Sequence, residues 1–193
     1  AVAFHPSGAL LTGDLHGRVR QWDAAGMLAR TFDAKEMYAL HRMQEVGGVR
    51  CFAVSADGTV FAGGAVPLTG GFVTAANLVI GFDWQTGKRT ATWKSDGDKD
   101  GYVHDLRPHP AGYLMGATSG QPGTGKVFLW KPGDPQPFYA AAKPNCHGLD
   151  LHPDGVRLVA SGTNPNGSGN GRPKGDVYPH SHAPIHLVTL PRA

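Results

Sequence analysis

The sequence has few cysteines, little clustered charge and no long apolar run. Cys51 and Cys146 are the only cysteines among 193 residues, too few for the disulfide framework of a small secreted domain. The charged residues make up 17% of the chain with a formal net charge of +3, and they are scattered, so nothing indicates a basic nucleic-acid groove. No apolar run reaches the roughly 18 residues of a membrane-spanning helix. Neither nucleic acid nor a membrane is therefore expected as a partner.

Glycine and proline, by contrast, are abundant. The chain contains 28 glycines and 15 prolines, while 40% of its residues are hydrophobic. Disorder is not expected, because aromatic and β-branched residues recur between the glycines. This combination predicts many turns that join short strands.

One short turn sequence occurs four times along the chain. Its closing glycines are 50, 54 and 43 residues apart, and a short run of alternating apolar residues flanks each turn. A repeat of about 40 to 50 residues that contains only strands and turns is typical of a β-propeller. The four copies are His5-Pro6-Ser7-Gly8, Ser55-Ala56-Asp57-Gly58, His109-Pro110-Ala111-Gly112 and His152-Pro153-Asp154-Gly155.

The repeats predict an all-β fold. We expect a β-propeller with three complete four-stranded antiparallel blades and an incomplete fourth, at about residues 1–33, 47–96, 101–144 and 146–193. The two cysteines fall near the start of the innermost strands of repeats two and four. With a whole blade between them, they are expected to be buried thiols rather than a disulfide.

The third strands of the repeats align on a large apolar residue. Trp22, Phe82 and Trp130 occupy this position, and we expect them to be core residues. Trp22-Asp23 at the end of such a strand, after a glycine-bearing turn, resembles the WD-repeat (WD40) family, and Phe82-Asp83 and Trp130-Lys131 look like degenerate copies. The His-Pro-(Asp/Ser)-Gly turn is also typical of bacterial members of that family.

The resemblance implies a function as well as a fold. WD-repeat propellers are typically non-catalytic scaffolds that bind proteins or peptides and need no cofactor. The family's internal His–Asp–Ser/Thr–Trp hydrogen-bond network is not expected here, because His16 stands where the family has an aspartate before the turn glycine. Family rings most often have seven blades, so we expect residues 1–193 to be the C-terminal part of a longer propeller whose N-terminal blades would complete it. Closure by dimerisation and a distorted four-bladed ring are the alternatives.

A candidate binding surface follows from the register of the turns. Arg50, His104 and His147 each lie eight residues before a turn glycine, which places them at the tops of three innermost strands, near the channel mouth. Such a cationic collar could bind a carboxylate, a phosphate or an acidic side chain; the alternative is three solvated polar residues. Tyr38 and Arg42 join the candidates from a long link at 33–48, part of which could form a short helical turn. Further loops are expected at about 66–77, 118–125 and 161–184.

Other motifs support enzyme chemistry only weakly. Gly120 to Lys126 has the glycine and lysine spacing of a phosphate loop, but Val127 follows where Ser or Thr is needed. A metal site is a weak alternative on Asp176, His180, His182 and His186, because prolines interrupt the segment. The rival functions are a metal-dependent lactonase or hydrolase of the propeller type, or a purely structural domain of a larger exported bacterial protein. The sequence assigns no compartment.

Overall fold

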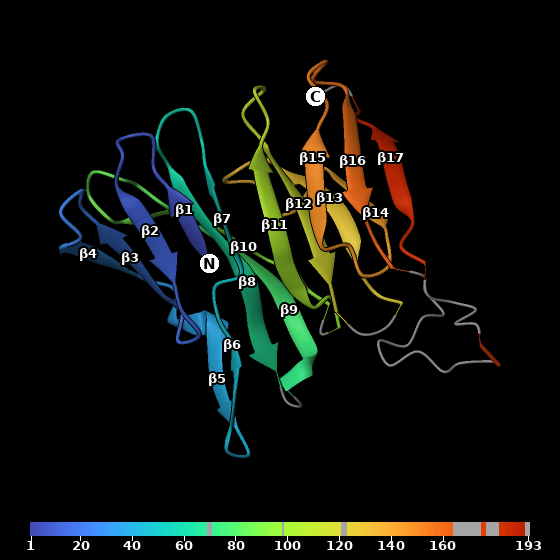
Figure 1. The fold of residues 1–193 in the computed structure, drawn as a ribbon, viewed down its shortest axis with the longest axis horizontal. Helices are drawn as coiled ribbons and strands as arrows, with labels where there is room; N and C mark the ends of the chain where they lie inside the picture. Colours follow the sequence, from blue (N-terminus) through green and yellow to red (C-terminus); the bar gives the residue numbers. More distant parts are fainter. Residues whose placement is uncertain (69–70, 98, 121–122, 164–174, 177–181, 192–193) are drawn as a thin grey trace.

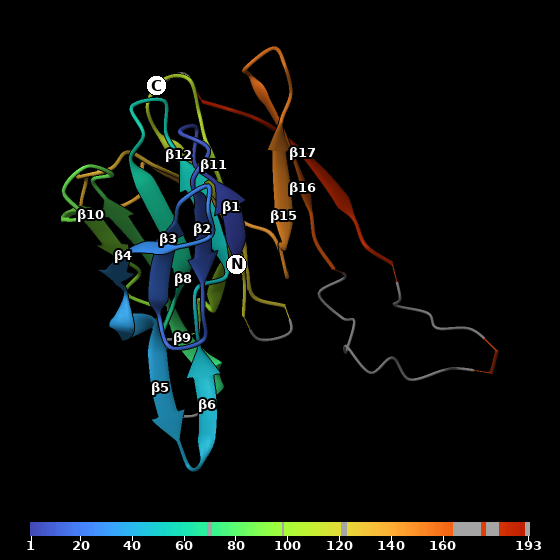
Figure 2. The ribbon, with the colours of Figure 1, turned by 60° about the vertical axis from the view of Figure 1, so that its left-hand side comes forward.

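The computed structural model describes residues 1–68, 71–97, 99–120, 123–163, 175–176 and 182–191. In this part of the chain, four antiparallel sheets lie side by side in an arc, with the first sheet at one end and the last at the other (Figure 1). Three sheets have four strands in sequence order and the last has three. The first strands of neighbouring sheets contact one another, and Figure 2 shows the first and last sheets at opposite ends of the arc from a second direction. The predicted fold class, three complete blades and an incomplete fourth in a partial ring, is confirmed.

The blades contain short strands joined by tight turns. Blade one consists of β1 (Val2–Phe4), β2 (Leu10–Gly13), β3 (Arg18–Trp22) and β4 (Leu28–Asp33). Blade two consists of β7 (Cys51–Val54), β8 (Val60–Leu68), β9 (Gly71–Phe82) and β10 (Arg89–Lys94). Blade three consists of β11 (Tyr102–Pro108), β12 (Leu114–Ser119), β13 (Lys126–Trp130) and β14 (Tyr139–Ala142). Blade four consists of β15 (Gly148–Leu151), β16 (Arg157–Ser161) and β17 (Ile185–Thr189).

The repeated turn joins the first and second strands of each blade. Its glycine has a φ of 86° at Gly8, 85° at Gly58, 86° at Gly112 and 69° at Gly155, a left-handed conformation that glycine adopts without steric cost. In every copy the glycine N–H donates to the carbonyl of the residue three positions earlier, at 2.8–2.9 Å. In blades one to three the turn also fixes the same register between the first two strands. Blade four has one more residue after the turn glycine, so Leu151 pairs with Leu158.

The hydrophobic core lies between the blades. Strand residues alternate, so each sheet presents one apolar face to the preceding blade and one to the next. Between blades two and three, the Trp93 ring lies 4.6 Å from that of Phe128 and 6.3 Å from that of Trp130, centroid to centroid. The two cysteines belong to these cores as free, buried thiols, as the sequence predicts.

Two segments differ from the sequence prediction. The link at 33–48 contains the expected helical turn, a 3₁₀-helix η1 (Lys35–Met37), but also an unpredicted hairpin of β5 (Tyr38–His41) and β6 (Gln44–Gly47). The prediction of a loop at 66–77 is wrong, because β8 and β9 continue as a long hairpin through most of this segment. Its small residues explain the extension: Ala65 and Ala75 are buried in one cluster with Tyr102.

Trp22 is the third difference. Phe82 and Trp130 are fully buried, as predicted, but Trp22 is only half-buried, because it lies on the face of blade one that has no preceding blade among the described residues. Its indole Nε1 donates to Thr12 Oγ1 at 2.9 Å. The Thr–Trp link of the family network, which the sequence did not lead us to expect, is therefore present. In the part of the chain that the structure covers, no helix is long and apolar enough to span a membrane.

Candidate partner-binding site

The three collar residues Arg50, His104 and His147 come from three different blades and lie at the same end of the strands. The backbone N–H of Arg50 donates to Gly63 O at 2.8 Å, and that of His147 donates to Ser161 O at 3.2 Å. Both residues therefore stand just before the first strand of their blade, each paired with the second strand. His104 lies within β11, where the register with β12 shifts between Val103 and Asp105. Such a bulge re-aims a side chain.

Ring contacts join the collar into a continuous row. The imidazoles of His104 and His147 have centroids 4.8 Å apart and an interplanar angle of 60°. Tyr102 connects this pair to blade two, since its ring lies 6.3 Å from that of His104 and the Arg50 guanidinium carbon lies 4.9 Å from the Tyr102 centroid. The row crosses two blade junctions, so its geometry depends on how the blades pack.

Burial keeps the two imidazoles uncharged at neutral pH. Burial, and then the nearby charges of His147 and Arg50, lower the pKa of His104 from its ordinary 6.5 to about 4. Burial also lowers the pKa of His147. The guanidinium of Arg50 is exposed and stays protonated. The Tyr102 hydroxyl is buried and has no hydrogen-bond partner among the described residues. The collar thus presents one permanent cation, two imidazoles and the buried hydroxyl of Tyr102.

This arrangement suits an anion. A carboxylate or phosphate accepts hydrogen bonds from a guanidinium and from imidazole N–H groups. A nearby negative charge favours the protonated imidazole, so an anion bound here would draw protons onto His104 and His147 and strengthen its own contacts.

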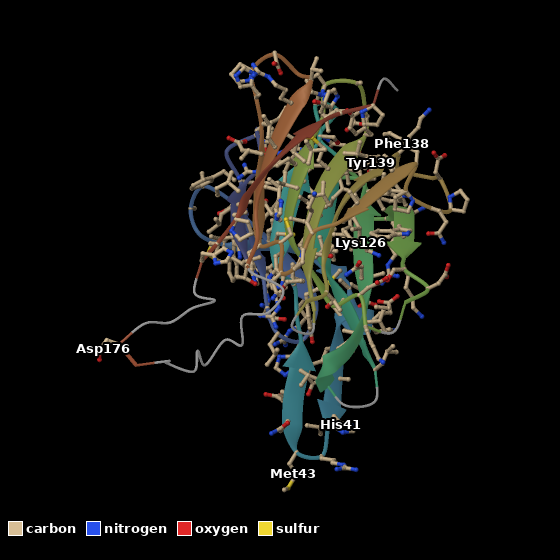
Figure 3. All side chains as sticks on the ribbon, turned by 90° about the vertical axis from the view of Figure 1, so that its right-hand side faces the viewer. His41, Met43, Lys126, Phe138, Tyr139 and Asp176 are labelled. Carbon is tan, nitrogen blue, oxygen red and sulfur yellow. The ribbon has the colours of Figure 1, made fainter. Side chains whose placement is uncertain are left out.

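Tyr38 and Arg42 are not part of this row. Both lie on the β5–β6 hairpin, which stands out from the blades with Met43 at its tip (Figure 3). The Tyr38 hydroxyl donates to Glu45 Oε1 at 3.0 Å, within the hairpin. In the described part of the chain, no hydrogen bond, ion pair or ring contact connects Tyr38 or Arg42 to the collar. They remain candidates for a second contact area, not for the same pocket.

The weak metal alternative is not assembled in the described residues. Asp176 stands well outside the blades (Figure 3), whereas His186 lies on β17, paired with Ala160. No three His, Cys, Asp or Glu side chains among the described residues are placed to hold a metal ion. His180 lies outside the described residues, so this alternative remains a prediction.

The repeated turns have a role that the sequence did not reveal. The Nε2 of His5 lies 3.2 Å from Gly58 O, and the Nε2 of His109 lies 2.9 Å from Gly155 O. Each contact joins a turn to the turn of the next blade, and we call it a His–Gly clasp. The N–H of Ala111 donates to His109 Nδ1 at 3.0 Å, so Nδ1 is the acceptor and Nε2 carries the proton donated to the carbonyl.

The junction between blades two and three has no such clasp. Ser55 replaces the histidine there, and its hydroxyl donates to Asp57 Oδ1 at 2.5 Å instead. An open cleft of about 1050 Å³ lies at this point. Its lining includes Ser55, Asp57, His109, Tyr113 and Lys131. The sequence signal for a clasp is a histidine at the first position of one turn followed, one repeat later, by a glycine at the last position of the next turn.

Comparison with known proteins supports the WD-repeat resemblance. The family model for the WD domain, G-beta repeat, matches residues 1–23. No curated protein sequence matches the chain. Among solved structures, a chain of the mitotic checkpoint complex is 14% identical, with a TM-score of 0.59 over 84% of this chain and 45% of the other. The Cps50 (Swd1) β-propeller domain of Myceliophteria thermophila is 17% identical, with a TM-score of 0.58 over 85% and 48%.

These similarities establish the fold. Residues 1–23 match the model of a WD40 repeat, and the blades as a whole have the arrangement of a β-propeller. The chain spans about half the length of the propeller chains that it matches.

Proposed function

We propose that this chain is a non-catalytic interaction module that binds an acidic segment of a protein or peptide at the collar. The observation that carries the proposal is the row formed by Arg50, Tyr102, His104 and His147 across three blades. A rigid sheet scaffold holds these groups in place before binding, so less entropy is lost when a partner docks.

The chemistry of the row favours an acidic side chain or a terminal carboxylate over a neutral ligand. Arg50 supplies an exposed charge, and each imidazole supplies one N–H when neutral and two when protonated. The hairpin residues Tyr38 and Arg42 extend the proposal to a second contact area, which a longer partner could reach. Nothing in the row acts as a nucleophile, so binding, rather than turnover, is the activity we assign to it.

The test uses a defined acidic probe. We expect an N-acetylated hexaglutamate peptide to bind in isothermal titration calorimetry, and a hexaglutamine peptide not to bind. Replacing Arg50, His104 and His147 together by Ala should weaken hexaglutamate binding at least about ten-fold, a change of about 1.4 kcal/mol. Binding should tighten as the pH falls from 7.5 to 5.5, because the bound anion favours the imidazolium forms.

Lys88→Ala is the matched control. It removes one positive charge from the turn between β9 and β10, at the opposite end of the strands, and should leave the affinity unchanged. Circular dichroism should show that the triple variant keeps its sheet content. Equal affinity of the wild type and the triple variant, or equal binding of both peptides, would contradict the proposal.

A further inference from the structure

Both ends of the arc carry exposed apolar side chains. At equivalent strand positions of the inner blades, apolar side chains are buried between blades. On blade four, Ile185 is 68% and Leu187 is 69% exposed. On blade one, Val2 and Phe4 are each 76% exposed. The largest apolar patches on a soluble monomer usually mark an interaction site.

The exposed face of blade four repeats the interface between blades three and four. Val159 pairs with Leu187 across β16 and β17, just as Met115 pairs with Leu129 across β12 and β13. Met115 and Leu129 are fully buried against blade four. The face bearing Val159 and Leu187 is therefore built to cover another blade.

The exposed face of blade one is the complementary kind of face. Phe4, Leu10 and Trp22 form one cross-strand row. The corresponding row of blade two, Val54, Val60 and Phe82, packs against blade one. The row that begins at Phe4 is thus shaped to pack on a preceding blade.

The clasp residues at the two ends are complementary as well. The N–H of Asp154 donates to His152 Nδ1 at 3.2 Å, the same local bond that orients His109 in its clasp. The Nε2 of His152 lies 3.2 Å from the Arg157 guanidinium rather than against a glycine carbonyl. On blade one, Gly8 is exposed, whereas the clasped Gly58 and Gly155 are half-buried. One end thus carries a turn histidine that is held by Arg157 and Asp154 of its own turn, and the other carries an exposed turn glycine.

We propose that a second copy of this chain covers these faces head to tail. The blade-four face of each copy packs on the blade-one face of the other, with His152 clasping Gly8 of the second copy. Blade one is the occupant that the structure itself offers, because it carries both the apolar row and the turn glycine that the blade-four face requires. Because one chain spans about half of the propeller chains that it matches, two copies supply the blades of one ring, within the usual 4–8.

Light scattering coupled to size-exclusion chromatography tests the stoichiometry. We expect a species of twice the 20.3 kDa of one chain, which dissociates on dilution. Phe4→Asp and Leu187→Asp each place a charge in both interfaces of a closed dimer, so each variant alone should be monomeric. Met43→Asp, at a hairpin tip with 95% exposure, is the control and should stay dimeric.

Mixing the two monomeric variants tests the head-to-tail arrangement. A pair of Phe4→Asp with Leu187→Asp contains one unaltered interface and one doubly altered interface, so the mixture should form a heterodimer that neither variant forms alone. Circular dichroism must show both variants folded, which their exposed positions predict. A third variant, His152→Ala, should weaken the dimer without unfolding the chain.

Several results overturn the proposal. A wild-type chain that is monomeric at every concentration shows that the faces are not covered by a second copy; additional blades of a longer polypeptide would then be their partners. A Leu187→Asp variant that remains dimeric indicates blade-one faces packed together, and a Phe4→Asp variant that remains dimeric indicates blade-four faces packed together. An open series of larger species excludes closure by two copies.

Discussion

Removing one His–Gly clasp should measurably loosen the blades. We predict that His109→Ala lowers the free energy of unfolding by about 2 kcal/mol. About 1 kcal/mol comes from the hydrogen bond between His109 Nε2 and Gly155 O. The imidazole also stacks on Tyr113 at 4.2 Å between centroids and an interplanar angle of 7°, and such a ring pair contributes about 0.5–1.5 kcal/mol. The Gly155 backbone is half-buried, so water can partly satisfy its carbonyl.

The assay is urea denaturation followed by circular dichroism, with thermal melting as a second measurement. For a chain of this size, about 2 kcal/mol corresponds to a melting temperature lower by roughly 4–8 °C. Both proteins are compared in the Leu187→Asp background, which removes any contribution from self-association. The matched control is His152→Ala in that background, a histidine in the same turn that has no following blade to clasp.

The control should lose less than about 0.5 kcal/mol, the usual limit for surface substitutions. Equal losses for His109→Ala and His152→Ala would refute the reasoning, because the effect would then come from the turn itself and not from the contact between blades.

Three further predictions follow from the buried groups and from the unclasped junction. His104→Gln should reduce the loss of stability between pH 6.5 and 4, because burial lowers the pKa of His104 from 6.5 to about 4 and the unfolded state alone takes up the proton in that range; melting curves against pH measure this. Cys51 and Cys146 should resist iodoacetamide at pH 8 until urea is added, since burial raises the pKa of both thiols, to about 11 for Cys146. Ser55→His should create a clasp to Gly112 and raise the free energy of unfolding by about 1 kcal/mol, as urea denaturation will show.

The repeat pattern predicted those features that depend on position within one blade. The first strand ends four residues before the turn glycine in each blade, so counting back from Gly58, Gly112 and Gly155 placed the collar residues at one end of three blades. Glycine, proline and asparagine misled the prediction at 66–77, because these residues favour loops, whereas Ala65 and Ala75 here pack in one buried cluster with Tyr102. Trp22 was misjudged because its burial depends on a neighbouring blade rather than on its own strand.

The clasps and the hairpin escaped prediction for a related reason. A His-Pro-x-Gly segment is a complete turn by itself, and nothing within one repeat indicates that its histidine reaches the next. The β5–β6 hairpin turns at Arg42 and Met43, both with positive φ, which neither residue type favours. The surrounding structure must stabilise this strained backbone conformation, and the local sequence alone does not indicate it.

A second contact between blades three and four lies beside the collar. Two substitutions of the same residue there should change the affinity for hexaglutamate differently. Asp105 follows His104 directly, and its Oδ2 accepts a hydrogen bond from Leu149 N at 3.0 Å, two residues after His147. Asp105→Asn keeps an acceptor oxygen for Leu149 but removes a negative charge that opposes a bound anion, so hexaglutamate should bind more tightly. Asp105→Ala removes the contact as well, so the His104–His147 pair should loosen.

The alanine variant should therefore bind hexaglutamate more weakly than the asparagine variant by several-fold, the effect of losing a net hydrogen bond of about 1 kcal/mol that positions the pair. Calorimetric titration at pH 6.5 measures both affinities at a temperature where both variants are folded. If the two substitutions change the affinity equally, the charge of Asp105 alone matters, and the spacing of the two imidazoles does not limit binding.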